Sequence, residues 1–531
     1  MARLKEYNGH YCESEYEYAF IEFLEAEGWK YSSGNNISRV TKRDVLIADD
    51  FKKFIADTDP DLTEDEVTQI YDNVRLVGAE SDFATLHKVY GWMVNGVQFT
   101  PQDRLPRMIP LIEFDNWDKN IFRVVNQFTV EYTNNGQKEN RRADVLLFVN
   151  GIPLCVIELK NPADANATIY DAWEQINIRY WRDIPHLLHY CPLACISDGV
   201  KTRLGTVRTP YEHFYAWRRV NEGDVVSTLP FAETETMIKG IYTPERFVEI
   251  FRDYIYFQDS IYDCDEVEIV CRYPQFFAAK LLKQSIVNSV VTRSGKGGTY
   301  FGATGCGKTY TMAFLARQLA LRCTDIPEIG SPTIILIVDR DELQKQGSKL
   351  FTKSKEFLNL GEVSVVKNRT QLRQELGARQ SGGFYICTIQ KFCDREDDKI
   401  GLINDRQNII CFSDEAHRTQ LEHSKKIQFS KDADENMKAM VSKPYAKVLK
   451  EAFPHATFVG FTGTPIAETY QTFGDEIDRY TMDQAVADGL TVSIKYHPRI
   501  AKVLLDNKKV KEIENYYKKC ADDGATYEDI E

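Results

Sequence analysis

One short stretch of the sequence has the residue types and spacing needed to hold phosphate groups. It reads GATGCGKT and fits the pattern G-x-x-x-x-G-K-[ST] at every specified position. Glycines let successive backbone N–H groups turn inward around phosphate oxygens. Lys308 would reach the outer phosphates as a point charge, and Thr309 would place its hydroxyl on Mg²⁺. The predicted nucleotide contacts are Gly302, Ala303, Thr304, Gly305, Cys306, Gly307, Lys308 and Thr309.

An acidic pair follows an apolar segment further along the chain. Residues Asn408–Phe412 read NIICF, and Asp414 and Glu415 come just after them in the order DEAH. Asp414 would bind Mg²⁺ through water, and Glu415 would orient or deprotonate the water that attacks the nucleotide. The phosphate loop and the acidic pair each follow a predicted strand, which is where open parallel sheets bind ligands. Together they predict a site that hydrolyses a nucleotide.

A second set of chemical groups lies well before the loop, in the stretch RADVLLFVNGIPLCVIELKNP. Two apolar segments, 145–149 and 154–159, flank an Asn-Gly pair and predict a β-hairpin that carries Asp144, Glu158 and Lys160. Two carboxylates that hold Mg²⁺ and a lysine that orients water and phosphate suit phosphodiester hydrolysis. An edge hairpin with a solvated glutamate and lysine is the alternative.

The register of this hairpin decides whether the carboxylates can meet. A two-residue Asn150-Gly151 turn pairs Val149 with Ile152, and therefore Asp144 with Ile157, which turns Glu158 to the other face. The site requires one additional residue. We predict a three-residue loop, 149–151, with Gly151 left-handed, although a bulge elsewhere in the hairpin would serve as well. A plain two-residue turn without a bulge would exclude the metal site.

The elements that must position these groups alternate in type. A helix is predicted over 14–28, where Ser14 and Glu17 read as a capping box, and residues 44–100 are predicted to be mostly helical. A second hairpin is predicted around Asp198-Gly199. In the second half, apolar segments at 333–338, 384–389, 408–412 and 457–461 predict a buried parallel sheet.

Composition limits the class of protein. The 531 residues contain 66 basic and 79 acidic residues, for a net charge of −13. This balance argues against a generally basic DNA-binding surface and leaves local groups such as Arg141, Arg142 and Lys160, or Lys201 and Arg203. The 12 cysteines form no CxxC pair, so structural zinc is not expected. No apolar run reaches the ~18 residues of a membrane span, so we expect a cytoplasmic protein without membrane contact.

The D-x13-E-x-K spacing resembles the PD-(D/E)xK nuclease signature. The segment Asp171–Tyr180 resembles the Gln–Tyr motif of the RecB-like branch of these nucleases, which implies auxiliary roles for Gln175 and Tyr180. That motif usually spaces the two residues by four, whereas here the spacing is five. Glu15 on the first helix is a candidate for an additional carboxylate on the metal side.

The later motifs resemble those of superfamily 2 helicases. The resemblance implies that Gln275 reads the adenine edge, that His417, Thr462, Gly463 and Thr464 couple nucleotide state to movement, and that Arg340, Gln390 and Lys391 contact DNA. It implies an α/β fold in which a PD-(D/E)xK nuclease domain precedes a RecA-like motor lobe. The segment Tyr480–Tyr496 looks like a linker to a second lobe, and no arginine finger can be placed. We therefore expect an N-terminal part of a longer polypeptide, with domains at 1–225 (nuclease), 226–267 (helical connector), 268–470 (first motor lobe) and 471–531 (start of the second lobe).

A nuclease followed by a motor on one chain resembles the R subunit of type I restriction enzymes. The stretches that carry the resemblance include RADVLLFVNGIPLCVIELKNP, RYPQFFAAK, GATGCGKT, SDEAHRTQ, FTGTPI and YTMDQAVADGL. The resemblance implies ATP-driven translocation on double-stranded DNA, Mg²⁺-dependent cleavage, and partner methyltransferase and specificity subunits, of which the methyltransferase brings S-adenosylmethionine. Another nuclease–helicase, such as a type III restriction or repair enzyme, is an alternative, although type III enzymes usually carry the nuclease after the motor. A third possibility is a DNA-binding scaffold whose sites have decayed. The presence of six catalytic candidates argues against it: Asp144, Glu158, Lys160, Lys308, Asp414 and Glu415.

Overall fold

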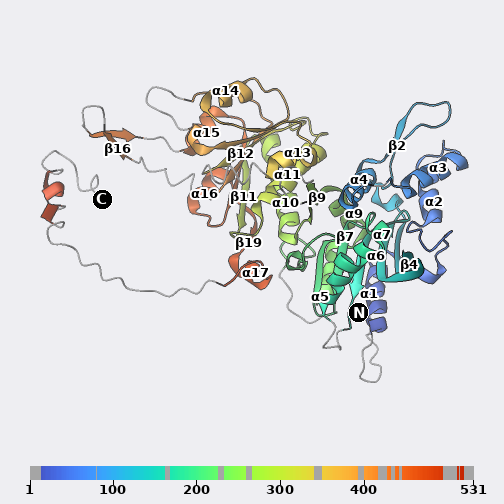
Figure 1. The fold of residues 1–531 in the computed structure, drawn as a ribbon. Coiled ribbons are helices and arrows are strands. Elements are labelled where there is room, and N and C mark those ends of the chain that lie inside the picture. The colour runs from blue at the N-terminus through green and yellow to red at the C-terminus, as the bar shows by residue number, and fades with distance from the viewer. Residues whose placement is uncertain are drawn as a thin grey trace. The chain divides into compact units, whose positions relative to one another are not determined.

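The computed structural model describes most of the chain (Figure 1). The described residues are 13–78, 80–161, 168–224, 232–258, 266–339, 350–392, 400–416, 427–431, 437–441, 445–493, 511–512 and 515–519. Two compact units are present, residues 1–490 and 491–531. All the sites considered below lie in the first unit.

The N-terminal region is built on a six-stranded mixed sheet in the order β1-β4-β5-β6-β7-β8. The long hairpin β4–β5 is antiparallel, and β6 pairs antiparallel with β5 and parallel with β7. Every residue of β6 is buried, so its near-continuous apolar sequence matches a central strand. The strands are β1 (Lys30–Ser33), β4 (Phe122–Asn134), β5 (Gln137–Val149), β6 (Ile152–Leu159), β7 (Leu193–Ser197) and β8 (Thr202–Thr206).

Helices surround this sheet. The predicted first helix is present as α1, and the predicted helical stretch that follows contains α2, α3 and α4. Thr63 caps α3 by accepting from the backbone N–H of Glu66, as its capping-box sequence indicates. The helices are α1 (Glu13–Ala26), α2 (Ala48–Thr58), α3 (Glu64–Arg75), α4 (Asp82–Asn95), α5 (Ile169–Glu174), the π-helix η3 (Gln175–Tyr180), α6 (Trp181–Asp183) and α7 (Pro185–Leu188). A small hairpin joins β2 (Val97–Phe99) and β3 (Arg107–Ile109).

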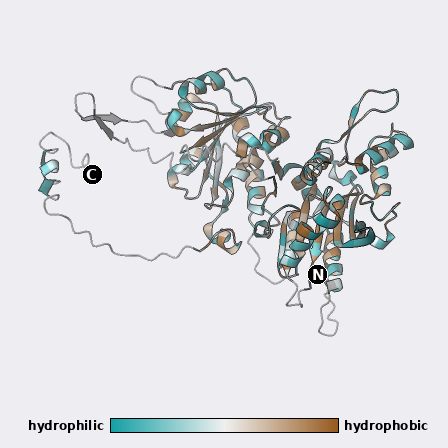
Figure 2. Ribbon diagram, viewed as in Figure 1, coloured by the Kyte–Doolittle hydropathy of each residue, from teal (hydrophilic) through white to brown (hydrophobic). Residues whose placement is uncertain are grey.

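The second half contains a seven-stranded sheet in the order β13-β14-β12-β15-β18-β11-β19, and all its strand pairs are parallel. The predicted buried strands are present and form its centre. Figure 2 shows apolar residues gathered on these strands. The strands are β11 (Lys296–Gly302), β12 (Thr333–Val338), β13 (Val363–Val365), β14 (Phe384–Thr388), β15 (Ile409–Asp414), β18 (Thr457–Thr462) and β19 (Glu476–Tyr480).

The helices of this half include the two that flank the phosphate loop, α10 and α11, which pack against each other. Strand β19 lies beyond residue 470 and pairs with β11 at the edge of the same sheet. The helices are α10 (Tyr273–Thr292), α11 (Lys308–Arg322), α13 (Lys355–Leu358), α14 (Arg369–Gly377), α15 (Tyr445–Ala452), α16 (Ala467–Phe473) and α17 (Met482–Ala487). A separate hairpin pairs β16 (Ile427–Lys431) with β17 (Met437–Val441).

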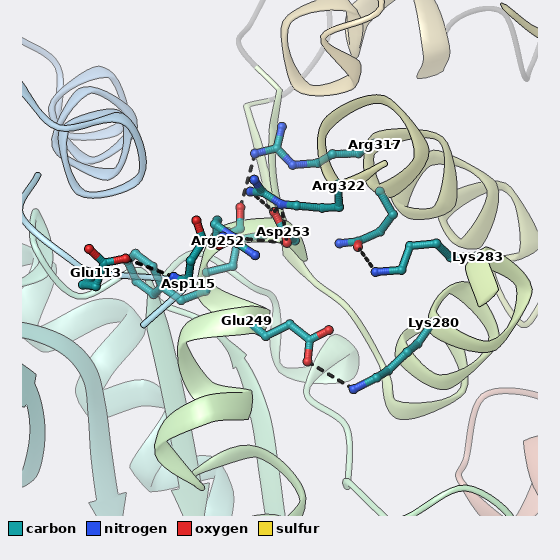
Figure 3. A network of polar contacts seen from close by, with 12 residues as sticks. Glu113, Asp115, Glu249, Arg252, Asp253, Lys280, Lys283, Arg317 and Arg322 are labelled. Atoms are coloured by element: carbon teal, nitrogen blue, oxygen red, sulfur yellow. Dashed lines mark hydrogen bonds and ion pairs between the residues drawn. The ribbon is translucent and has the colours of Figure 1, made fainter. Parts of the chain in front are cut away.

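The segment between the two sheets contains α8 (Ala232–Ile241), α9 (Pro244–Asp253) and a hairpin of β9 (Ile255–Gln258) with β10 (Val267–Val270). A buried ion-pair network ties it to the helix that follows the phosphate loop (Figure 3). Asp253 is 1% exposed and accepts a 2.6 Å bond from Nη2 of Arg322 on α11. Arg317, also on α11, donates to the carbonyl of Arg252. Because a buried carboxylate is costly unless it is paired, these contacts hold α9 and α11 together.

Candidate phosphodiester and nucleotide sites

The hairpin turn differs from the predicted loop. Asn150 and Gly151 form a two-residue turn with φ values of 52° and 75°, and Val149 pairs with Ile152. The predicted three-residue loop is therefore wrong. The physical cause of the two-residue turn lies in distant parts of the chain. The buried Asn150 side chain accepts from the Ile121 N–H at 2.8 Å, and a Cβ on Gly151 would lie 2.2 Å from the carbonyl oxygen of Ile47. These contacts fix the tight turn.

The required additional residue is supplied by a bulge within β6. The register shifts between Leu147 and Phe148, which leaves Leu154 as the extra residue opposite them. Val145 then pairs with Ile157, so the next pair along the hairpin is Asp144 and Glu158. The bulge thus places the two carboxylates opposite each other. A bulge within the hairpin was the alternative to the three-residue loop.

Five of the predicted residues meet at this end of the hairpin. Asp144 Oδ2 accepts a 2.9 Å bond from the Leu159 N–H. Glu158 accepts from the Tyr180 hydroxyl at 2.6 Å and from Gln175 Nε2 at 2.5 Å. Lys160 Nζ donates to Gln175 Oε1 at 3.2 Å, so the lysine joins the cluster through the amide.

The π-helix explains the spacing of Gln175 and Tyr180. An α-helix places residues four apart on one face, whereas a π-helix has a wider turn with i→i+5 bonding. Gln175 and Tyr180 are the first and last residues of η3, and Gln175 Nε2 lies 3.0 Å from the Tyr180 oxygen. The wider turn brings the two side chains onto the same carboxylate despite the additional residue between them.

Burial and charge make this cluster suited to a cation. Glu158 has no exposed surface, and burial raises its pKa well above the ordinary value, with a further increase from the nearby Asp144 charge. Lys160 opposes this shift only in part. A divalent ion would relieve the repulsion between the two carboxylates, so the donor set fits Mg²⁺. Among the described residues, no group of three or more His, Cys, Asp or Glu side chains is placed to hold a metal.

The first helix contributes a different glutamate from the predicted one. Glu15 is exposed on α1, whereas Glu17 is 5% exposed and accepts from Asn126 Nδ2 at 2.6 Å and from Gln127 Nε2. Burial raises the pKa of Glu17, and the nearby Asp144 charge raises it further. The Glu17 side chain bonds these amides of β4 and therefore points inward from α1. Only its helical spacing relative to Phe20 and Leu24 could have indicated that it points inward.

The phosphate loop has the geometry that its sequence predicts. Gly305 and Gly307 have φ values of 82° and 86°, in the left-handed region that favours glycine. Lys308, the first residue of α11, donates from Nζ to the carbonyl of Gly302 at 3.2 Å. The helix N-terminus and the loop amides therefore face the same space, as anion binding requires.

The acidic pair lies across from this lysine. Lys308 Nζ is 3.8 Å from Glu415 Oε1. The pKa of Asp414 is raised from 3.8 to about 6, because burial, with a smaller contribution from the Glu415 charge, outweighs the lowering effect of Lys308. In the parallel sheet β18 lies between β15 and β11, so the carboxyl ends of these three strands bring Asp414, Glu415 and Thr462 to the same side as the loop. A Cβ on Gly463 would lie 3.2 Å from Thr304 Oγ1, so the Thr462–Thr464 segment touches the loop directly.

A cavity of about 490 Å³ adjoins the loop. Gln275 lines it, accepts from the Arg272 N–H at 2.9 Å and donates to the Gly307 carbonyl at 3.3 Å. The sequence did not indicate that the N-terminal region forms its other wall. Tyr215 lies there, with the Arg272 guanidinium 3.6 Å from its ring centroid. Nothing in the spacing of these residues could have predicted this contact.

Two of the three candidate DNA-contacting residues, Gln390 and Lys391, lie among the described residues. Gln390 donates to the Asp339 carbonyl at 2.7 Å and Lys391 to Thr388 Oγ1 at 3.2 Å, at the carboxyl ends of β12 and β14. Arg340 and His417 lie outside the described residues. Of the basic groups proposed near the hairpin, Arg141 pairs with Asp183 and Arg203 with Glu233, whereas Arg142 and Lys201 are exposed.

These features define a phosphate-loop α/β ATPase domain preceded by an α/β domain with a buried acidic cluster. Residues 11–213 match the family model of the type I restriction enzyme R protein N terminus, and residues 274–528 match that of the SWI2/SNF2 ATPase. The first region is therefore similar to the N-terminal part of type I restriction enzyme R proteins, and the second region is similar to SWI2/SNF2 ATPases.

Two curated relatives and one solved structure show similarity to parts of this kind of protein. The chain is 30% identical to the type I restriction enzyme HindI endonuclease subunit of Haemophilus influenzae, over 91% of this chain and 46% of that protein. It is 29% identical to a type I restriction enzyme relative from Methanocaldococcus jannaschii, over 97% of this chain and 49% of that protein. A solved fragment of a type I HsdR subunit from Vibrio vulnificus aligns at 17% identity over 70% of this chain and 57% of that one, with a TM-score of 0.26. The chain spans about half the length of the two curated relatives. No helix among the described residues is long and apolar enough to cross a membrane.

Proposed function

We propose that this chain carries the nuclease and the ATP-hydrolysing motor of a type I restriction enzyme. In this proposal the protein translocates double-stranded DNA at the expense of ATP and cleaves it with Mg²⁺. It works with methyltransferase and specificity subunits, and S-adenosylmethionine belongs to the methyltransferase. The observation that supports this function best is the cluster of Asp144, Glu158 and Lys160 on the same chain as a complete phosphate loop and its acidic pair.

The N-terminal domain would act as a PD-(D/E)xK nuclease. Mg²⁺, when bound, would lower the pKa of a water molecule and stabilise charge at the phosphorus. Asp144 and Glu158 would hold the ion, and the amide and phenol bonded to Glu158 would fix the direction of its oxygens. Lys160, kept near the cluster by Gln175, would orient the scissile phosphate.

The motor would use the groups around the loop. The loop amides and Lys308 would bind the phosphates of ATP, and Thr309 and Asp414 would hold its Mg²⁺. Glu415, whose carboxylate lies 3.8 Å from Lys308 Nζ, would orient the attacking water. Gln275, which lines the cavity beside Gly307, would read the adenine edge.

Two single substitutions test this division of labour. Lys308→Ala should abolish ATP hydrolysis and with it translocation-dependent cleavage. Asp144→Ala should abolish cleavage of duplex DNA and leave ATP hydrolysis intact. Both activities are to be measured on each variant under the same conditions. If Asp144→Ala stopped ATP hydrolysis and left cutting unchanged, the assignment of chemistry to the two domains would be overturned.

A further inference from the structure

A buried carboxylate joins three parts of the chain that are far apart in sequence. Asp488 follows α17 directly, and its side chain is 9% exposed. Its Oδ1 lies 2.9 Å from Nε of Arg218, in the segment after β8 that belongs to the N-terminal half. Arg218 also donates to the Ala487 carbonyl at 3.3 Å. One oxygen of Asp488 is therefore held by the N-terminal half.

The other oxygen receives two tyrosine hydroxyls. Tyr273, the first residue of α10, donates to Asp488 Oδ2 at 2.7 Å, and Tyr480, the last residue of β19, donates at 2.6 Å. Burial and the Asp488 charge raise the pKa of both phenols, so both remain protonated donors. Both phenols thus form charge-assisted hydrogen bonds, the strong class of such bonds, to one carboxylate, and Arg218 adds an ion pair.

Tyr480 contacts the phosphate loop directly, whereas Tyr273 is connected to it through Gln275. The carbonyl of Tyr480 accepts a 2.8 Å bond from the N–H of Ala303, the second residue of the loop. Tyr273 lies two residues before Gln275 on α10, and the Gln275 amide donates to the Gly307 carbonyl. The two tyrosines thus support the loop at its beginning and near its end.

We propose that Asp488 is a positioning residue for the nucleotide site. It holds Tyr273 and Tyr480, the two supports of the phosphate loop, at a fixed distance from each other and from Arg218 of the N-terminal half. Loss of this junction lets the loop relax away from the geometry that binds nucleotide. This inference rests on the proposed ATPase function and adds to it a residue outside the sequence motifs of the site.

A neighbouring ion pair provides a matched control. Asp478 on β19 pairs with Arg219 at 3.0 Å, and Arg219 also donates to the carbonyl of Arg479. This pair joins the same two regions and is as buried as the first, with side-chain exposures of 6% and 10%. Among the described residues, neither of these two side chains forms a hydrogen bond with a tyrosine. The Arg219 guanidinium lies 5.6 Å from the Tyr273 ring centroid, but Asp478→Asn removes a carboxylate charge and leaves both tyrosine bonds to Asp488 in place.

The experiment compares Tyr480→Phe, Asp488→Asn and Asp478→Asn in the protein assembled with its partner subunits. Measurements are the KM and kcat for ATP, the affinity for a fluorescent ATP analogue, and the thermal midpoint. We expect Tyr480→Phe to raise KM about fivefold and Asp488→Asn about tenfold or more, because each removes bonds to a buried charged group. Asp478→Asn should leave KM unchanged within about twofold, even where its thermal midpoint falls as far as that of Asp488→Asn.

The outcomes separate this inference from the function on which it rests. If Asp488→Asn and Tyr480→Phe changed KM and affinity no more than Asp478→Asn does, the positioning role would be wrong. Tyr480→Phe keeps the ring and removes a single hydroxyl, so it answers the question even if Asp488→Asn fails to fold. Undiminished ATP hydrolysis by Lys308→Ala would instead contradict the proposed function itself.

Discussion

Gln175 and Tyr180 meet on the same carboxylate although five positions separate them. Their side chains lie 3.0 Å apart, and both bond Glu158, because the segment between them is a π-helix. A π-turn is rare and less favourable than an α-turn, and such turns are frequent at functional sites. The local deformation is thus linked to the position of two side chains around a buried acid.

Tyr180→Phe should shift the pH dependence of DNA cleavage. Metal binding requires ionised Glu158, and the Tyr180 hydrogen bond lowers the pKa of Glu158 against the larger effect of burial. Removing the hydroxyl raises that pKa further, so the acidic limb of the cleavage profile should move to higher pH. Activity at neutral pH should fall about tenfold and recover in part at higher Mg²⁺ concentration. A uniform loss at all pH values would show that the hydroxyl acts in some other way.

Two glutamates on the same helix should behave differently. Glu17→Gln should lower cleavage by about tenfold or more and raise the Mg²⁺ concentration needed, because Glu17 lies near Asp144 and is held by two amides. Glu15→Gln makes the same chemical change at an exposed position of α1 and should have no effect. Titration of cleavage with Mg²⁺ measures both. Equal effects of the two substitutions would contradict a role of Glu17 in the metal site.

Gly151→Ala should destabilise the N-terminal domain strongly. The added Cβ would lie 2.2 Å from the Ile47 carbonyl oxygen, in addition to the unfavourable φ of 75°. We expect a loss of roughly 2–4 kcal/mol in the free energy of unfolding. Gly136→Ala is the matched control, because Gly136 has a φ of 81° but no atom within 4 Å of the added Cβ. That variant should lose about 1 kcal/mol from backbone strain alone. Urea denaturation compares the two, and equal losses would contradict the role of the close contact.

Asp414→Asn should stabilise the nucleotide-free protein while abolishing Mg²⁺-dependent ATP hydrolysis. The pKa of Asp414 is raised from 3.8 to about 6, so between these values the folded protein binds more protons at this residue than the unfolded chain does. This group therefore lowers stability as the pH rises through that window, and its ionised form is unfavourable at neutral pH. At neutral pH the thermal midpoint of the variant should exceed that of the parent protein by a few degrees. The difference should shrink towards pH 4. A lower midpoint at neutral pH would contradict the expected cost of the buried charge.

The sequence was most informative where a function depends on neighbouring residues. The phosphate loop is a run of consecutive backbone amides, so its pattern predicted the left-handed glycines and the position of Lys308 at the start of a helix. The apolar strands of the parallel sheet were equally readable, because strands buried on both faces need continuous apolar runs. Their carboxyl ends then brought Asp414 and Glu415 to the loop.

Tertiary structure decided what depends on contacts between distant residues. The hairpin turn was set by Ile121 and Ile47, and the extra residue moved to Leu154 within the strand, a choice that the turn sequence alone leaves open. The choice of Glu17 over Glu15 followed from the packing of α1 against β4. The junction at Asp488 exists only because three separate segments fold together, and no local pattern records it. The sequence by itself determines sites built from residues that are adjacent along the backbone. Packing determines which residues from distant segments come together around a buried charged group.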